Sequence, residues 1–170
     1  MKVVYVLGMF FSCLILTSCG GEKKKEKESF SYEKSSTKED IKEEPNIANI
    51  VISGDDSMKF DKTEIKVKAG QKVKLTLRHK GKMDINVMGH NIVILKKGVN
   101  LASFAGKAAT AKETKYIPES FKNDIIAYTD LIGGKQTTSI EFDAPEVGTY
   151  DFLCSFPGHY AIMKGKFIVE

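Results

Sequence analysis

The sequence lacks tryptophan and has few cysteines, histidines and prolines. Without tryptophan, the 10 phenylalanines and 6 tyrosines must supply the aromatic packing of any core. Three cysteines in 170 residues are too few for a small domain held together by disulfides. The 26 Lys and Arg against 22 Asp and Glu leave a net charge of +4, which is too balanced to indicate nucleic acid as a partner.

Long apolar runs are also scarce, and the one that stands out lies at the N-terminus. Lys2 precedes a mostly apolar run, Val3–Leu16. A membrane-spanning helix needs about 20 such residues, whereas the apolar part of a signal peptide is shorter. The run is therefore predicted to belong to a targeting signal.

The residues that follow this run resemble a bacterial lipobox. In such a motif, here Leu16-Thr17-Ser18-Cys19, the signal is cleaved before the cysteine and the cysteine takes lipid. We predict a signal peptide over 1–18, lipidation of Cys19, and attachment to a membrane of the bacterial cell envelope, facing the periplasm. The alternative is an uncleaved N-terminal anchor in which Cys19 has no role.

The stretch after Cys19 is predicted to be a disordered tether. Residues 20–45 contain seven Lys and eight Asp or Glu in 26 positions, so they have little apolar surface to bury. As a random coil this length spans about 30 Å. The lysines of 23–27 could instead bind phospholipid headgroups, but the interleaved glutamates oppose that. We therefore assign 19–45 as the lipidated cysteine and its spacer, and 46–170 as one folded domain.

Short alternating segments indicate an all-β domain. The hydrophobic fraction of 42% is sufficient for a packed core, and turn signals such as Gly54-Asp55-Asp56 and Gly133-Gly134 separate the segments. Seven or eight short strands in this length predict a β-sandwich. The predicted strands are Ile47–Ile52, Glu64–Lys68, Gln71–Leu77, Asn91–Leu95, Thr137–Phe142, Gly148–Leu153 and Gly165–Val169.

The region 101–128 breaks the β pattern. Leu101–Lys112 is rich in Ala and Lys, and its Leu101, Ala105 and Ala108 lie at helical spacing. We predict a short helical insertion or flap between two strands.

The chemistry concentrates near the C-terminus. Once Cys13 leaves with the signal and Cys19 takes lipid, Cys154 is the one free thiol, and a lone exported thiol indicates a metal or catalysis. Cys154, His159 and Met163 form a C-x4-H-x3-M array, and His90 supplies a second imidazole. Two His, one Cys and a distant Met are the ligand set of a blue-copper site, which accepts both Cu(I) and Cu(II).

Each of these residues also has an ordinary explanation. A C-x4-H spacing occurs by chance, a methionine near a C-terminal strand usually packs in the core, and a single strand histidine is more often structural than a ligand. The convergence of the lone thiol, two of the three histidines and a suitably spaced methionine favours the metal site. His79, the third histidine, is interpreted as structural or near the site rather than as a ligand.

Taken together, these segments resemble the azurins, small bacterial cupredoxins of the plastocyanin/azurin family. The resemblance covers about 48–170 and rests on 54–60, Met88-Gly89-His90-Asn91, Leu131-Ile132-Gly133, 154–159 and Met163-Lys164-Gly165. It implies an eight-stranded Greek-key sandwich with one copper ion. It also implies that His90, Cys154 and His159 are in-plane ligands, and that Met163 and the Gly89 carbonyl are weak axial ones.

The resemblance further implies supporting and docking residues. Asn91 and Phe156 would support the Cys154 loop through packing and hydrogen bonds. Electrons would leave through an apolar partner patch around His159, and the alternative is that these residues are buried loop packing. Lys59 and Lys164 could flank the patch and bias it toward acidic partners. The patch comprises Met58, Val87, Met88, Pro157 and Ile162, with Phe156 beside them.

Two departures from azurins are visible. Their N-terminal disulfide has no counterpart, because Ala48 and Gln71 stand at the matching positions, and Ile92 stands where azurins often have tryptophan. The first departure predicts somewhat lower stability without a change of fold.

Three functions compete at this point. An electron carrier would shuttle single electrons between envelope redox proteins such as c-type cytochromes or terminal reductases and oxidases. A copper storage or delivery protein is the second, although such proteins generally use exposed Met, Cys or His clusters. A copper enzyme needs more histidine ligands than His79 can supply. A zinc-filled site also stays open, and the electron carrier is the favoured prediction.

Overall fold

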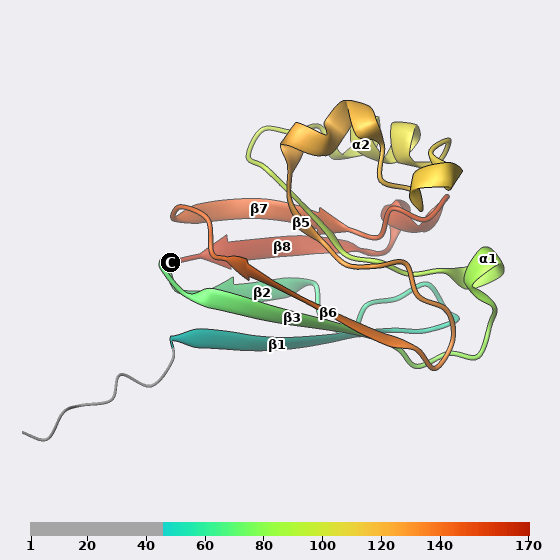
Figure 1. The fold of residues 1–170 in the computed structure, drawn as a ribbon, viewed down its shortest axis with the longest axis horizontal. Helices are drawn as coiled ribbons and strands as arrows, with labels where there is room; N and C mark the ends of the chain where they lie inside the picture. Colours follow the sequence, from blue (N-terminus) through green and yellow to red (C-terminus); the bar gives the residue numbers. More distant parts are fainter. Residues whose placement is uncertain (1–45) are drawn as a thin grey trace, which may run out of the picture. The chain divides into compact units, whose positions relative to one another are not determined.

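The computed structural model describes residues 46–170, in which eight strands form two sheets packed face to face (Figure 1). The predicted signal, Cys19 and tether lie outside the described residues. The predicted all-β sandwich is confirmed. The strands are β1 (Ile47–Gly54), β2 (Glu64–Val67), β3 (Lys72–His79), β4 (Val93–Leu95), β5 (Ile125–Tyr128), β6 (Thr137–Asp143), β7 (Gly148–Leu153) and β8 (Lys164–Val169).

The two sheets differ in size and both mix parallel with antiparallel pairs. The smaller has the order β1-β3-β6 and the larger β2-β8-β7-β4-β5. β1 runs parallel to β3, and β2 parallel to β8, whereas the remaining pairs are antiparallel. β1 ends at Gly54 and β8 begins at Lys164, and both of these strand ends lie beside the residues of the site.

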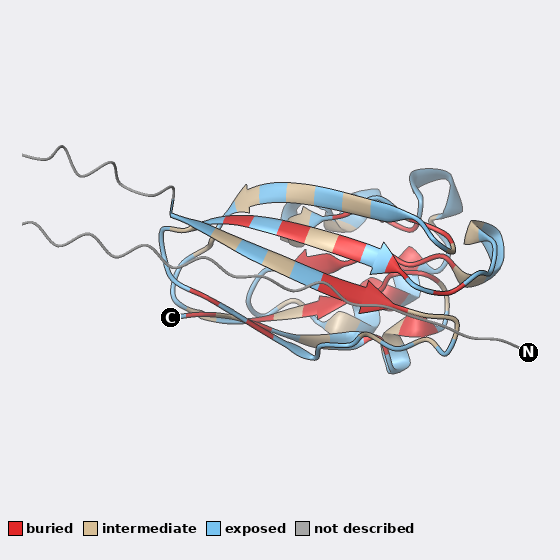
Figure 2. Cartoon of the chain, turned by 90° about the horizontal axis from the view of Figure 1, so that it is seen from below, coloured by how far each residue is buried: buried red, intermediate tan, exposed pale blue. Residues whose placement is uncertain are grey.

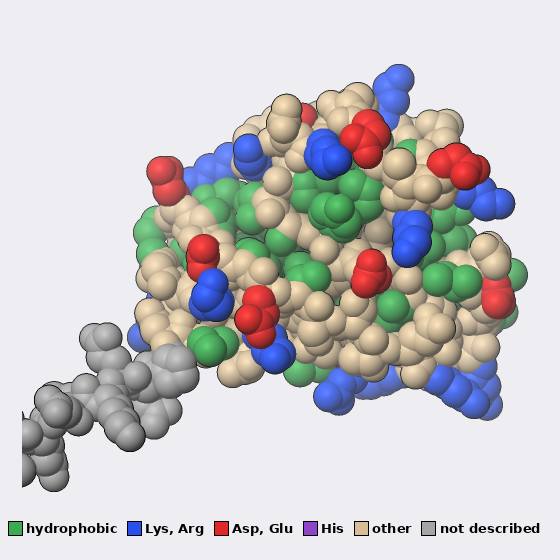
Figure 3. All heavy atoms as spheres, viewed as in Figure 1, with side chains coloured by type: hydrophobic (Ala, Val, Ile, Leu, Met, Phe, Trp, Pro, Cys, Tyr) green, Lys and Arg blue, Asp and Glu red, His purple; other side chains and the backbone are tan. Residues whose placement is uncertain are grey.

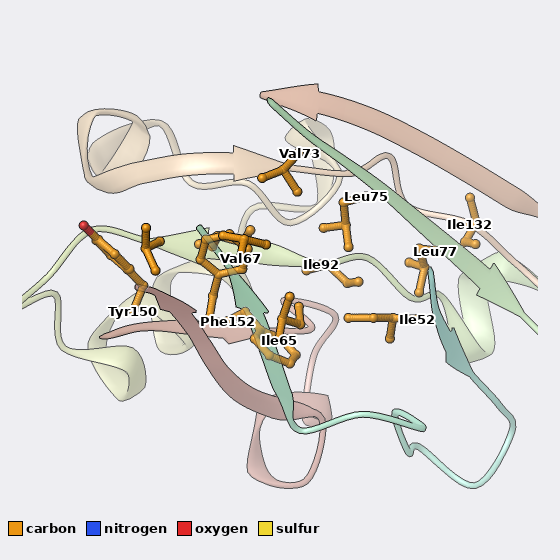
Figure 4. Close-up of a cluster of buried hydrophobic side chains, with 13 residues drawn as sticks. Ile52, Ile65, Val67, Val73, Leu75, Leu77, Ile92, Ile132, Tyr150 and Phe152 are labelled. Atoms are coloured by element: carbon orange, nitrogen blue, oxygen red, sulfur yellow. The ribbon is translucent and has the colours of Figure 1, made fainter. Parts of the chain in front are cut away.

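The core lies between the sheets and follows from the period-two pattern. In β3, Val73, Leu75 and Leu77 are buried, whereas Lys74 is exposed and Thr76 partly exposed, and such alternating bands are visible in Figure 2. These residues pack against Ile65, Phe152 and others of the facing sheet (Figure 4). Full burial of each such side chain contributes about 1.5–3 kcal/mol.

The seven predicted strands are all present, and their ends differ from the prediction by at most two residues. The eighth strand, β5, was missed because it lies inside the region assigned to the flap. It pairs with β4 across a register shift between Ile94 and Leu95, so its position depends on a contact that local sequence does not reveal.

The predicted helical insertion is confirmed and covers the outer face of the larger sheet (Figure 1). It contains α2 (Leu101–Ala108) and two short 3-10 turns, η1 (Lys112–Thr114) and η2 (Glu119–Asp124). The Asn100 side chain caps α2 by accepting a hydrogen bond from the Ser103 amide (2.8 Å). Phe104, Ala105 and Ala108 of α2 form a second core with Val93, Leu95 and Leu153.

This second core explains why β4 is buried along its whole length. Its Ile94 faces the first core, whereas Val93 and Leu95 face α2. The segment that follows His90 is therefore packed on both of its faces. No helix within residues 46–170 is long and apolar enough to cross a membrane.

Two glycines make a matched test of this packing. Gly165 of β8 pairs with Phe152, and a Cβ added there would overlap the Phe152 ring and the Thr63 carbonyl oxygen. Gly165→Ala is therefore expected to lower the free energy of unfolding by about 1–3 kcal/mol, measured by urea denaturation of the metal-free protein.

Gly106 in α2 is the control, because an added Cβ there has nothing within 4 Å. Gly106→Ala should raise the free energy of unfolding by about 0.5–1 kcal/mol, since alanine restricts the unfolded chain and suits a helix. If both substitutions shift stability in the same direction, the packing described for Gly165 is wrong.

Candidate metal centre

Three predicted site residues meet at one end of the sandwich. Three potential ligand atoms, one each from His90, Cys154 and His159, lie within 4.8 Å of one another. All three residues are buried. The Cys154 Sγ lies 3.6 Å from the His159 Nδ1. His90, which is distant in the sequence, thus joins Cys154 and His159 of the predicted C-x4-H-x3-M array.

The loop from Cys154 to Met163 closes on itself. Cys154 follows directly on β7, and its amide donates to the Met163 carbonyl (2.9 Å) where β8 begins. Between them the chain turns through Gly158, whose φ of 82° lies in the left-handed region that favours glycine. The short turn η3 (His159–Ala161) follows, and the Met163 amide donates to the His159 carbonyl (2.8 Å). These bonds bring the His159 imidazole back beside the thiol.

His90 is fixed by its backbone and by its ring. Its backbone bridges to Ile132, with amide to carbonyl distances of 2.9 Å in both directions. Its Nε2 lies 2.9 Å from the Asp55 carbonyl oxygen and donates to it when that nitrogen carries the single proton of the neutral imidazole. In that tautomer Nδ1 has a lone pair available to a metal ion.

Gly89 presents its carbonyl oxygen to the same cluster. This oxygen lies 3.0 Å from the His90 Nδ1 and 3.8 Å from the Cys154 Sγ. A Cβ at Gly89 would lie 2.5 Å from the Ile85 carbonyl oxygen and 2.9 Å from the Phe156 ring, so only glycine fits. Met163 is fully buried in one apolar cluster with Cys154 and Phe156. Both predicted axial residues therefore border the three-residue cluster.

Asn91 links the two segments that carry the site. Its Oδ1 accepts from the Ser155 amide (2.8 Å), and its Nδ2 donates to the Ser155 hydroxyl (2.8 Å). Backbone amides of Asn91 and Phe156 also point at the Cys154 sulfur. Phe156 is buried, and its ring centroid lies 4.7 Å from that of His159. Asn91 therefore bonds to the Cys154 loop, and Phe156 packs within that loop against His159.

His79 lies beside the cluster but not in it. Its ring stacks on His90 with centroids 4.2 Å apart and planes 10° apart. Its Nε2 donates to the Met88 carbonyl (2.8 Å), and its Nδ1 accepts from the Gly81 amide (3.1 Å). Both ring nitrogens are thus occupied, so His79 positions His90 and the loop that precedes it.

Two further residues were noted in the sequence as part of a turn and of the 54–60 segment, without a role at the site. A Cβ at Gly54 would lie 2.8 Å from the His90 ring and 3.3 Å from the Met163 methyl, so the backbone of β1 packs directly on the site. The Asp56 carboxylate accepts from the amides of Lys82 and Met83 (2.8 and 3.3 Å) and holds the loop over His79. These backbone hydrogen bonds, that of Lys82 first, hold the pKa of Asp56 below its usual value.

Burial dominates the electrostatics of the three clustered side chains. It raises the pKa of the Cys154 thiol to about 11, although the amides of Asn91 and Phe156 act in the opposite direction. It lowers the pKa of His159 to about 4, with the neighbouring histidines adding to the effect. The pKa of His90 is also lowered, chiefly by burial. In the metal-free protein at neutral pH, the thiol is protonated and these two imidazoles are neutral.

The predicted partner patch is exposed in part. Val87 and Ile162 are 61% and 54% exposed, Met58, Met88 and Pro157 are half-buried, and Phe156 is buried. Val87 and Met88 lie in α1 (Ile85–Met88). Met83, which the sequence did not single out, adds a 44% exposed apolar side chain, and hydrophobic atoms reach the surface at the α1 end (Figure 3).

The His159 ring lies at the edge of this surface. Every buried side-chain nitrogen or oxygen among residues 46–170 has a hydrogen-bond partner. The His159 Nε2 has no such partner in that range, so this atom is not buried. The Nε2 edge therefore touches solvent, although the residue as a whole is only 3% exposed. The imidazole spans from the buried thiol to the surface.

Comparison with known proteins gives a consistent result. A family model described as copper binding proteins, plastocyanin/azurin family, matches residues 47–170. Azurin-1 of Alcaligenes xylosoxydans xylosoxydans is 38% identical over 121 residues, which cover 69% of this chain and 93% of that protein. Outer membrane protein H.8 of Neisseria gonorrhoeae is 35% identical over 119 residues, covering 68% of this chain and 63% of that protein.

Among solved structures, auracyanin A, a "blue" copper protein from the green thermophilic photosynthetic bacterium Chloroflexus aurantiacus, is 33% identical with a TM-score of 0.66. The match covers 73% of this chain and 99% of auracyanin A.

The protonation states predict how metal uptake depends on pH. A metal ion binds the thiolate, so at pH 7 each ion should displace one proton from Cys154 and none from the imidazoles. Titrating the metal-free protein with redox-inert Zn²⁺ in weak buffer should release about one proton per ion, read with a pH indicator. At pH values below the thiol pKa, the affinity for Zn²⁺ should rise about tenfold for each unit by which the pH is raised.

Cys154→Ser is the control, because a serine hydroxyl keeps its proton at pH 7 and should release none. Uptake of Zn²⁺ by the parent protein without proton release would show that the thiol is already ionised, contrary to the effect of burial.

Proposed function

Because the chain belongs to the plastocyanin/azurin family of copper-binding proteins and is a blue copper electron-transfer protein, we propose that it shuttles electrons between redox proteins of the cell envelope while lipid on Cys19 holds it to a membrane. The observation that carries the electron-transfer role is the buried convergence of His90, Cys154 and His159. Those residues come from two segments about 64 positions apart that Asn91 joins.

The donor set fits copper. A soft thiolate suits Cu(I), imidazoles suit Cu(II), and three such donors at one point make a trigonal site with a weak axial position. We propose that His90 Nδ1, Cys154 Sγ and His159 Nδ1 would hold the copper ion. The Met163 thioether and the Gly89 carbonyl oxygen would supply the weak further donors, because both border the cluster from different segments.

When bound, copper supplies the one-electron step by alternating between Cu(II) and Cu(I). The protein contributes rigidity. His90 is held by the Asp55 carbonyl and stacked on His79, and the Cys154 sulfur receives two backbone amides. Ligands that are fixed before the electron arrives need little rearrangement when it moves, and this favours fast transfer.

Electrons are proposed to enter and leave through the His159 edge. This ring reaches from the thiol to solvent, and it lies at the apolar patch of Met58, Val87, Met88, Pro157 and Ile162. Exposed apolar surface on a folded domain marks an interaction site, and small interfaces suit transient electron transfer. The general partner class is a redox protein, for which c-type cytochromes or terminal reductases and oxidases are our candidates.

Storage or delivery of copper is the weaker alternative. Metal exchange favours exposed ligands, whereas His90 and Cys154 are 0% exposed and His159 is 3% exposed. A copper enzyme would need an additional imidazole, and both nitrogens of His79 already take part in hydrogen bonds. Neither alternative has an observation in its favour.

The visible spectrum tests the copper assignment with two matched variants. The oxidised parent protein is expected to show an intense blue band, and Cys154→Ser should lose it, because a hydroxyl cannot replace the thiolate as a copper donor. Met163→Leu removes only an axial donor, so it should stay blue while its reduction potential rises, since Cu(II) loses more than Cu(I).

Electrochemistry of the Met163→Leu protein separates a ligand from core packing. A potential that is unchanged or lower would show that Met163 only packs. A blue band that survives in Cys154→Ser, or a parent protein without one, would refute the blue-copper assignment.

The membrane attachment rests on the lipobox-like Leu16-Thr17-Ser18-Cys19. A lipid-modified cysteine with further acylation carries more than one chain, and two chains suffice for stable attachment. The relative named as an outer membrane protein supports an envelope location. The charged residues 20–45 would then act as a spacer between membrane and copper domain.

Cys19→Ala is expected to abolish fatty-acid labelling of the protein in growing cells, because no thiol remains at the proposed modification site. Cys13→Ala is the matched control and should be labelled normally, since Cys13 leaves with the signal. Continued labelling of the Cys19→Ala protein would contradict the proposed anchor.

A further inference from the structure

Gly54, the last residue of β1, has to be glycine for a reason other than its backbone conformation. A glycine is required either by a left-handed backbone or by the close approach of a neighbouring group. Gly70 and Gly98 have φ of 76° and 81°, whereas Gly54 has no positive φ. A Cβ added at Gly54 would lie 2.8 Å from the His90 Cδ2 and 3.3 Å from the Met163 Cε. Close approach is therefore the reason, and both neighbours are candidate copper ligands.

This contact joins the two sheets at the site. His90 lies just before β4, Cys154 follows β7 and Met163 precedes β8, and all three strands belong to the larger sheet. Gly54 ends β1 of the smaller sheet (Figure 1). The smaller sheet therefore touches an in-plane and an axial candidate ligand at one backbone position.

The backbone of Gly54 is fixed where it touches the site. Its carbonyl oxygen accepts from the Lys80 amide (2.8 Å) at the end of β3. Phe60 pairs with it in an isolated antiparallel bridge, and the preceding Ser53 amide donates to the Asp61 carboxylate (2.8 Å). β1 cannot withdraw from the site at this point without breaking such contacts.

The His90 imidazole is fixed as well. Its Nε2 lies 2.9 Å from the Asp55 carbonyl oxygen, and its face stacks on the His79 ring. Its backbone forms an isolated bridge with Ile132. Because three segments hold this residue, a methyl group added at Gly54 has to relieve its overlap by leaning away from the ring.

The Met163 methyl group is the neighbour that can yield. It is the end of an unbranched side chain, and methionine adapts readily to changes in packing. Met163 is fully buried in one apolar cluster with Cys154 and Phe156, so a displaced methyl group shifts the thioether within the site rather than into solvent. The missing side chain at Gly54 thus leaves the space in which the thioether is seated.

On the proposed electron-transfer function, we infer that Gly54 is a positioning residue for the axial donor. By lacking a side chain it seats the Met163 thioether at the copper site, and it thereby sets the reduction potential. The weak axial ligand tunes the potential of such sites. A displaced thioether stabilises Cu(II) less, so the potential depends on whether position 54 carries a side chain.

Gly54→Ala tests this role by electrochemistry and visible spectroscopy. Its blue band should persist, because Cys154 and both imidazoles stay in place. Its affinity for Cu(II) relative to Cu(I) should fall about tenfold, which raises a one-electron reduction potential by about 59 mV. Its affinity for Zn²⁺, which binds thiolate and imidazole, should stay within about threefold of the parent.

Val73→Ala is the matched control for a general loss of stability. Val73 is fully buried in β3, six residues before His79, which pairs with Gly54. Six residues of a strand span about 20 Å, so the substitution lies far from the site. Both variants should unfold at lower urea concentrations than the parent, but Val73→Ala should keep the parent's potential.

Gly54→Ala/Met163→Leu tests whether the effect passes through Met163. Leucine removes the thioether and the methyl group that lies near the added Cβ. Compared with Met163→Leu alone, the double variant should show little further rise in potential, because the two changes act on one contact. If Gly54→Ala alone does not fold, folding of the double variant would support the contact, and failure of both would contradict it.

An unchanged or lower potential in Gly54→Ala, or an equal rise in Val73→Ala, would overturn the inference. So would a loss of Zn²⁺ affinity in step with the potential, because His90 would then have taken the displacement. A full effect of Gly54→Ala in the Met163→Leu protein would also overturn it. A parent protein without a blue band refutes the blue-copper function itself, whereas a blue parent that responds to Met163→Leu but not to Gly54→Ala confines the failure to Gly54.

Discussion

The side chain of Asn91 joins two segments that are 64 residues apart, and the geometry of the site depends on that junction. Its amide group makes hydrogen bonds to the backbone and the hydroxyl of Ser155. This fixes the distance between the loop that carries His90 and the loop that carries Cys154. It also places the Asn91 backbone amide where it meets the sulfur. A buried polar side chain with all its partners made is costly to displace, so the two loops behave as one unit.

The sandwich supports this junction from both faces of the larger sheet. β4 leads directly away from His90 and Asn91, and its residues pack into the main core on one side and against α2 on the other. The predicted helical insertion is therefore part of what stiffens the site, although none of its residues is a candidate ligand. Tyr116, between η1 and η2 of the same insertion, packs on Phe156 and extends that support to the Cys154 loop.

The sequence predicted those parts of the site that are encoded locally. The C-x4-H-x3-M spacing holds Cys154, His159 and Met163 within one loop, and period-two alternation located seven strands. His90 came from its residue type and from the azurin resemblance, since nothing local joins it to Cys154. Gly54 was noted as a turn signal and as part of the azurin resemblance but not as a residue of the site, because its closeness to the His90 ring arises from the parallel pairing of β1 with β3. β5 and the stacking of His79 on His90 were missed for the same reason: both arise from contacts between distant segments.

The site must be dry enough to hold its ligands rigidly and still allow an electron to pass, and His159 reconciles the two requirements. Burial keeps its imidazole neutral, while a single ring edge reaches solvent within an apolar surface. A charged group at that edge would need water, which a docked partner has to displace. The side chains around that edge are instead apolar, Val87 and Ile162 among them, so a partner approaches the ring without displacing strongly held water.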